Sequence, residues 1–153
     1  ASTDRNKVYM RQPNGWTCGP TSLTMCLSAW GVRPTSVGTV NEMVGLTHTN
    51  PNDGVPDHDQ IPNAARKLGM QATYHDSSNA GQVRDALKAG HTVIYNGSLG
   101  TGGHFIYVAG LNSDGSFIIF DPARSGTTSM NDAQLNGFGH TNGHSGGFTE
   151  IWK

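Results

Sequence analysis

The sequence is short of charge, of cysteine and of long apolar runs. Asp, Glu, Lys and Arg make up 14% of the 153 residues, and the formal net charge is -1, whereas about a quarter of a typical soluble domain is charged. Lysine and arginine form no cluster, which argues against nucleic acid as a partner and against electrostatic attachment to a membrane. No stretch is long and apolar enough to span a bilayer, so we expect no membrane insertion.

The only two cysteines are Cys18 and Cys26. On one helix they would lie roughly 12 Å apart, at 1.5 Å of rise per residue, which is too far for a disulfide. The sequence therefore indicates neither an oxidising nor a reducing compartment. Cys26 falls within an apolar pattern, and we predict that it is buried as a small hydrophobic residue.

Glycine is abundant, with 21 residues, and no repeat or linker divides the chain. The length suits a single domain over residues 1–153. Gly-rich chains with few charges are common among secreted microbial proteins, so we expect a protein that is secreted or delivered outside the producing cytoplasm.

The segment 12–31, QPNGWTCGPTSLTMCLSAWG, predicts a helix that begins at Cys18. Pro20 suits a first turn, Thr17 can cap it, and Gly31 can end the helix. One buried stripe of apolar residues follows the spacing i, i+3, i+4, i+7, namely Leu23, Cys26, Leu27 and Trp30. At a helix N-terminus the free N–H groups and the helix dipole favour an anion. A thiol placed there is expected to have a depressed pKa and to react as a thiolate.

The remaining pattern favours an α+β fold, with helices early in the chain and strands late. A short strand at 8–10 is expected to lead to Gln12, and 125–147 reads as Gly-rich and irregular. We predict helices at 36–45, 60–68 and 79–89. We predict strands at 70–75, 92–96, 104–109, 117–120 and 148–152.

The loop 47–59 contains several possible metal ligands, namely His48, Asp53, Asp57, His58 and Asp59. It lacks the alternating acids and final Glu of a calcium loop, and the helical His spacing of a zinc site. We interpret it as a turn before a helix, with Asp57 or Asp59 as the N-cap. We predict no metal and no other cofactor.

The strands 104–109 and 117–120 are joined by a polar turn at 112–115, which predicts an antiparallel hairpin. His104 opens the first strand and Asp121 follows the second, so the two residues should face each other within a residue or two of register. A carboxylate beside an imidazole can orient a general base. Asp114 and Asp132 remain as alternative partners of His104. No hairpin places a carboxylate opposite the other histidines, which are His48, His58, His75, His91, His140 and His144.

These segments resemble the C39-type peptidase domain of the papain-like cysteine protease superfamily. The matching segments are Gln12, TCGPTSLTMCLSAWG, LKAGHTVIYNG and GGHFIYVAGLNSDGSFIIFDP, which together lie within 12–123. The resemblance implies a papain-like fold, in which the helix that begins at the cysteine packs on an antiparallel sheet.

The resemblance also implies roles for individual residues. Cys18 is the expected nucleophile, His104 the base and Asp121 the residue that orients it. The Gln12 amide and the Cys18 backbone N–H would hold the oxyanion. We also assign Trp16, Gly102 and Gly103, which adjoin these residues in sequence, to substrate binding.

The chain departs from the members of this family that mature bacteriocins. Those members carry an acidic residue before the cysteine, where this chain has Thr17, and they are fused to a membrane transporter. We therefore expect a stand-alone, monomeric cysteine hydrolase that cleaves amide bonds through an acyl-thioester. By analogy with bacterial and phage wall lytic enzymes, its expected partners are protein or peptidoglycan peptides, with 47–59 and 125–147 shaping the groove. Two alternatives are acyl transfer to an amine and a peptide-binding module without catalysis.

Overall fold

The computed structural model describes residues 1–77, 79–100, 103–140 and 146–153. Its centre is one antiparallel six-stranded sheet with the strand order β1-β6-β2-β3-β4-β5. The strands are β1 (Gln71–His75), β2 (Thr92–Ser98), β3 (Gly103–Leu111), β4 (Phe117–Phe120), β5 (Ser129–Met130) and β6 (Phe148–Trp152). The last strand, β6, therefore lies inside the sheet, between β1 and β2.

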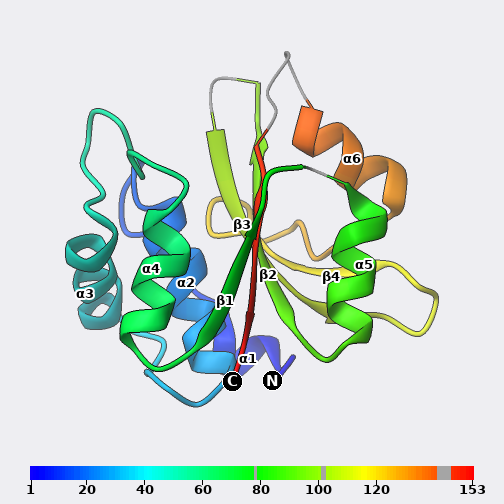
Figure 1. Ribbon diagram of the computed structural model, residues 1–153, viewed down its shortest axis with the longest axis horizontal. Helices are drawn as coiled ribbons and strands as arrows, with labels where there is room; N and C mark the ends of the chain where they lie inside the picture. The colour runs from blue at the N-terminus through cyan, green and yellow to red at the C-terminus, as the bar shows by residue number, and fades with distance from the viewer. Residues whose placement is uncertain (78, 101–102, 141–145) are drawn as a thin grey trace.

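Helices cover both faces of this sheet. They are α1 (Arg5–Val8), α2 (Cys18–Ala29), α3 (Val37–Thr47), α4 (Gln60–Lys67), α5 (Ala80–Lys88) and α6 (Asp132–His140). Figure 1 shows α2, α3 and α4 on one side of the sheet and α5 and α6 on the other. The α+β fold class predicted from the sequence is thus confirmed.

Two apolar clusters form the core, one on each face. Tyr107 of β3 packs with residues of α2 to α4, and its neighbour Ile106 packs with residues of α5 and α6. Successive side chains of a strand point to opposite faces, so β3 contributes to both clusters. His104 is in phase with Ile106, which places it on the α5–α6 face, whereas Phe105 packs against the α2 cluster.

The helix α2 begins at Cys18 as predicted, but its environment differs from the prediction. All of the residues from Gly19 to Leu27 are buried, not a single stripe, because the sheet covers one side of the helix and α3 covers another. Thr17 does not cap the helix through its side chain. Its hydroxyl donates instead to Asn14 Oδ1 at 2.9 Å.

The predicted strand at 8–10 is wrong. Asp4 accepts a hydrogen bond from the Asn6 backbone and starts the short helix α1, which ends at Val8. Tyr9 follows in an extended conformation, and its hydroxyl donates to the Asp121 carbonyl at 2.6 Å. Tertiary contacts therefore bring this segment to Gln12 without a strand.

The region 125–147 is not irregular throughout, because it contains β5 and α6. Asn131 and Gln134 bond reciprocally at the start of α6: each side-chain oxygen accepts from the other residue's backbone N–H at 2.8 Å. This capping box is a helix-start signal that was present in the sequence.

Of the two residues expected to cap the helix after the loop 47–59, Asp59 is the N-cap of α4 by position. Asp59 precedes α4, but its side chain makes no capping hydrogen bond, and Asp57 Oδ1 accepts from the Asp59 backbone rather than from the helix.

The predicted strands at 117–120 and 148–152 have the observed bounds of β4 and β6. In the parts of the chain that the structure describes, no helix has the length and apolar character needed to cross a bilayer.

Candidate active site

The β3–β4 hairpin brings His104 and Asp121 together. Tyr107 pairs with Phe120, so Asp121 lies diagonally across from His104 and on the same face of the sheet. His104 Nε2 lies 2.8 Å from Asp121 Oδ1. His104 is 5% exposed and Asp121 is fully buried. The predicted contact between these two side chains is thus present in the structure.

Three further donors hold the Asp121 carboxylate. Its Oδ1 accepts from the backbone N–H of Ala123 at 2.9 Å and from that of Arg124 at 3.2 Å. Its Oδ2 accepts from Arg124 Nε at 2.8 Å. Burial raises the pKa of Asp121, but the hydrogen bonds from His104, Ala123 and Arg124 outweigh it and hold this pKa below its ordinary value. Asp121 is therefore ionised at neutral pH.

His104 is poised to carry a proton. Burial lowers the pKa of His104, but the hydrogen bond to Asp121, the neighbouring Cys18 thiol and the negative charges of both groups raise this pKa to about 9. Because Nε2 faces Asp121, Nδ1 is the ring nitrogen left for Cys18. The arrangement thus favours an imidazolium next to the thiol.

Phe138 of α6 supports the imidazole from the side. Its ring meets the His104 ring edge to face, with centroids 6.1 Å apart. Gly97 of β2 pairs with His104, and a Cβ at Gly97 would lie 2.1 Å from the Phe138 ring. Only glycine therefore allows Phe138 to reach this position.

Cys18 lies at the start of α2, is half-buried and forms no disulfide. One turn later, the Ser22 hydroxyl donates to the Phe105 carbonyl at 3.2 Å. This bond fixes the start of the helix against β3, one residue from His104.

A small cavity of about 190 Å³, the Cys18 cavity, opens beside the thiol. Its walls include Cys18, Gly103, Phe105 and loop residues 53–58. The loop can approach because Gly19 has no side chain: a Cβ there would lie 2.5 Å from Val55 Cγ2.

Gln12 is linked to both halves of the site. Its backbone N–H donates to the Pro122 carbonyl at 2.9 Å, and its side-chain Nε2 donates to the Asn14 carbonyl at 2.7 Å. Asn14 Oδ1 in turn accepts from Trp16 N and Thr17 Oγ1, next to the helix start. The Asn14 carbonyl fixes the orientation of the Gln12 amide, and one Nε2 hydrogen stays available for another acceptor.

The three residues assigned to substrate binding have different outcomes. Gly103 lines the Cys18 cavity. Trp16 is half-buried and is not among the described residues that line this cavity. Gly102 lies outside the described residues. The roles of all three stay predictions.

The family is decided by comparison with known proteins. The family model described as "Peptidase_C39 like family" matches residues 6–141. The chain belongs to the Peptidase_C39 like family. The match begins within α1 and extends past the end of α6, and so includes every residue of the site described above. A comparison with curated proteins gives no match.

Solved structures of C39 peptidase domains have the same fold. The peptidase domain of Streptococcus ComA, a bi-functional ABC transporter involved in quorum sensing, is 19% identical with a TM-score of 0.66, over 94% of each chain. A double glycine motif protease from an AMS/PCAT transporter, solved with its leader peptide, is 18% identical with a TM-score of 0.65, over 97% of this chain and 94% of that one. A Bacillus anthracis protein, provisionally assigned as a C39-like peptidase, is 14% identical with a TM-score of 0.66, over 98% and 96%.

Sequence reasoning missed two neighbours of the predicted pair in this C39-like domain. Arg124 binds Asp121, and Phe138 contacts His104. Arg124 could have been suspected from its position in the turn directly after Asp121. Phe138 could not, because α6 was not predicted.

Other histidines also meet carboxylates, although no hairpin places the carboxylates there. His75 Nε2 lies 2.9 Å from Glu150 Oε1, and His91 Nδ1 bonds to Glu150 Oε2. His58 lies 3.3 Å from both Asp57 and Asp59, and all three side chains are exposed. Such exposed acidic groups are common without a metal, and we assign none here. His140, predicted in a loop, is the last residue of α6, and His144 lies outside the described residues.

Proposed function

We propose that this C39-like peptidase domain hydrolyses amide bonds of peptides through an acyl-thioester on Cys18. One observation carries the proposal: a buried imidazole, His104, is hydrogen-bonded to an ionised carboxylate, and the Cys18 thiol at a helix start is near enough to raise the pKa of His104. This is the nucleophile–base–orienter arrangement of acyl-transfer enzymes.

In the first half-reaction, the Cys18 thiolate attacks the scissile carbonyl carbon, and the C=O electron pair moves to the oxygen. The Cys18 backbone N–H and the second Nε2 hydrogen of Gln12 bind this oxyanion. His104 then gives its proton to the leaving nitrogen, the C–N bond breaks and an acyl-thioester remains.

In the second half-reaction, neutral His104 takes a proton from water, and the resulting hydroxide attacks the thioester carbonyl. The C–S bond breaks, the peptide acid leaves, and Cys18 is again a thiolate beside imidazolium. Asp121 stabilises the imidazolium in both half-reactions without changing its own charge.

The proposed substrates are peptides of proteins or of peptidoglycan, cleaved outside the producing cytoplasm. Support for a peptide comes from the family. Support for the location comes only from the sparsely charged, Gly-rich composition. A stand-alone enzyme and a monomer stay predictions.

The test is digestion of a peptide library and of purified peptidoglycan side by side, with products identified by mass. The proposal expects new amino and carboxyl ends from the parent and none from Cys18→Ala. Products that carry an added amine would indicate acyl transfer instead. No Cys18-dependent product from either substrate, with slow thiol alkylation, would favour the binding module.

A further inference from the structure

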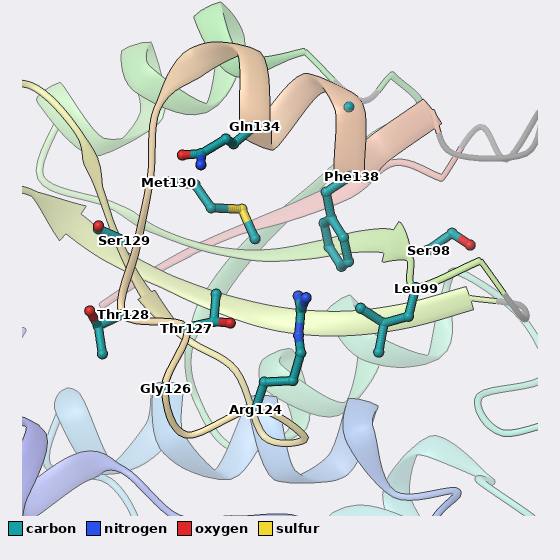
Figure 2. A pocket seen from close by; sticks show the side chains of 11 residues that line it. Ser98, Leu99, Arg124, Gly126, Thr127, Thr128, Ser129, Met130, Gln134 and Phe138 are labelled. Carbon is teal, nitrogen blue, oxygen red and sulfur yellow. The ribbon is translucent and has the colours of Figure 1, made fainter.

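A second and larger cavity lies on the other face of the sheet from the Cys18 cavity. It has a volume of about 620 Å³, is open to solvent and is lined by the end of β2, the segment 124–130 and α6. We refer to it as the Arg124 cavity, and Figure 2 shows its lining side chains. Most of the described lining residues are small or polar, and Arg124 is the only charged one among them. A cavity of this size can hold a small ligand or a short peptide segment.

The Arg124 cavity adjoins the His104–Asp121 pair. Arg124, in its wall, binds Asp121, and Phe138, also in its wall, contacts His104. His104 is in phase with Ile106 on the same α5–α6 face, whereas Phe105, which lines the Cys18 cavity, faces α2. The two cavities therefore flank the thiol–imidazole contact from opposite faces of β3.

The chemistry of the reaction assigns a substrate half to each cavity. In the proposed mechanism the acyl group becomes attached to the sulfur of Cys18, whereas the leaving nitrogen must be within reach of the His104 proton. The acyl half therefore belongs on the Cys18 side. The leaving half belongs on the His104 side, toward the Arg124 cavity.

The Arg124 guanidinium has hydrogen-bonding capacity that the protein does not use. Its Nε is bonded to Asp121, but its Nη2 is buried and finds no acceptor among the described residues. Figure 2 shows the guanidinium pointing into the cavity between Thr127 and Phe138. The side chain as a whole is 41% exposed, so a ligand reaches the guanidinium through its exposed atoms rather than through the covered Nη2. The planar N–H pairs of arginine match a carboxylate.

We propose that the Arg124 cavity binds the leaving segment of the substrate and that Arg124 binds a carboxylate on that segment. The inference rests on the proposed function and adds a substrate class: peptides cleaved a short distance before a carboxylate. The carboxylate can be the C-terminus or an acidic side chain, and the experiment separates the two sources.

The test uses peptides with one acyl half, taken from the cleaved library members, and leaving segments of one to three residues. Each segment is made as a free acid, as a C-terminal amide, and as an amide with a Glu side chain. For the parent we expect kcat/KM about 10-fold higher with a carboxylate than without, since a charge-assisted hydrogen bond at a part-exposed site is worth about that much. The difference should lie mainly in KM. Whichever carboxylate source gives the preference identifies the bound group.

Two arginine variants sharpen the result. Arg124→Gln should remove the carboxylate preference, and Arg124→Lys should keep part of it. The readout is the ratio between acid and amide, because Arg124 also holds Asp121 and its loss can slow every substrate. The matched control is Arg11→Gln. Arg11 donates to the Ala123 carbonyl at 3.2 Å, one residue from Arg124, but does not line the cavity, so its variant should keep the full preference.

A binding measurement keeps the inference testable without hydrolysis. With Cys18→Ala, NMR titration should show that the dipeptide Ala-Ala binds about 10-fold more tightly as an acid than as an amide, and that Arg124→Gln in the same background removes this difference. If the Cys18→Ala variant shows acid-selective binding that depends on Arg124, but the parent hydrolyses no substrate, the proposed function fails and the carboxylate site stands. Equal kcat/KM and equal binding of acids and amides, or a preference that survives Arg124→Gln, would overturn the inference.

Discussion

Among the described residues, two clusters that are at least partly buried pair a carboxylate with histidine, and only one of them faces a cysteine. At the first, Asp121 binds His104, and the neighbouring Cys18 thiol raises the pKa of this histidine. At the second, Glu150 of β6 binds His75 with one oxygen and His91 with the other. In the second cluster both imidazoles stack on aromatic rings of β6: His75 on Phe148 and His91 on Trp152, with centroids 4.5 and 4.1 Å apart.

The two clusters differ in which hydrogen-bonding atoms of the carboxylate and of the imidazole are already used. Backbone and arginine donors occupy the Asp121 oxygens, and its histidine keeps one ring nitrogen for a thiol. Glu150 divides its two oxygens between two histidines that tie β1 and the start of β2 to β6, and no hydrogen bond among the described residues joins these three side chains to a cysteine. An imidazole–carboxylate contact is therefore not a catalytic site by itself. The Glu150 cluster is best understood as a structural clamp across three strands.

The largest expected effect separates the two cysteines. Cys18→Ala should abolish hydrolysis, because no other group at the site can form the thioester. Cys26→Ala should keep the turnover and lower the free energy of unfolding by about 1 kcal/mol, the usual size for a point substitution. Steady-state kinetics and denaturant titration on both variants measure these effects, and an active Cys18→Ala enzyme would rule out the mechanism.

The next effect separates the two histidine clusters. His104→Ala should lower kcat by roughly 10²–10⁴, the usual contribution of a general acid–base group. His75→Ala should leave kcat unchanged, since the Glu150 cluster takes no part in the reaction. Similar losses in the two variants would mean that the clusters do not differ in function.

The rate of hydrolysis by the parent should depend on pH through the protonation of His104. Its pKa of about 9 means that the imidazolium is present below pH 9 and is lost as the pH rises through that value. Hydrolysis should therefore fall above pH 9. Asp121→Asn should move this alkaline limb to lower pH, because a neutral amide no longer supports the proton. Glu150→Gln is the control and should leave the limb in place.

Gln12→Ala tests the oxyanion site. Removing one of two donors should lower kcat by roughly 10²–10³. Alkylation of Cys18 by iodoacetamide forms no oxyanion, so its rate should stay near that of the parent. If alkylation slows together with kcat, Gln12 supports the start of α2 through Asn14 and is not an oxyanion donor.

The smallest effect on activity is expected from Glu150→Gln, which should change the stability of the fold instead. Burial raises the pKa of Glu150, but bonds to His91 and His75 outweigh it and lower this pKa below its ordinary value. The carboxylate therefore stabilises the fold above its unfolded pKa of about 4.3, and this contribution is lost as the pH falls through the lower, folded pKa.

Glu150→Gln should accordingly reduce the free energy of unfolding by roughly 1.5–3 kcal/mol at neutral pH, the value of hydrogen bonds to a charged group. The gap to the parent should close below pH 4. Denaturant titrations at several pH values measure it. A gap that is independent of pH would show that the charge on Glu150 does not stabilise the clamp.

The same comparison explains which parts of the molecule could be predicted. The contact between His104 and Asp121 could be predicted from the sequence because a short polar turn sets the register of one hairpin. The Glu150 clamp depends on β6 entering the sheet between β1 and β2, and no local signal sets that register. The helix α6 was missed because glycines 137 and 139 weaken its pattern, although the Asn131 capping box was readable.

The prediction for the segment before Gln12 was wrong for a related reason. An extended strand was predicted at 8–10, but an aspartate cap starts α1, and Tyr9 is held by Asp121 and by the Phe120 ring, 6.4 Å away. These contacts span more than 100 residues of sequence. Long-range contacts, rather than the local preference of residues 8–10 for a strand, thus determine the path of the chain to Gln12.

The most direct test of the central claim is the rate of Cys18 alkylation as a function of pH. Burial raises the pKa of Cys26 to about 12, so iodoacetamide reports on Cys18 alone. If a thiolate–imidazolium pair exists before substrate binds, the parent should react rapidly at pH 6, and His104→Ala should move the rise in rate to higher pH. A parent rate that rises only near the free-thiol pKa of about 8.5, and that His104→Ala does not shift, would contradict the account.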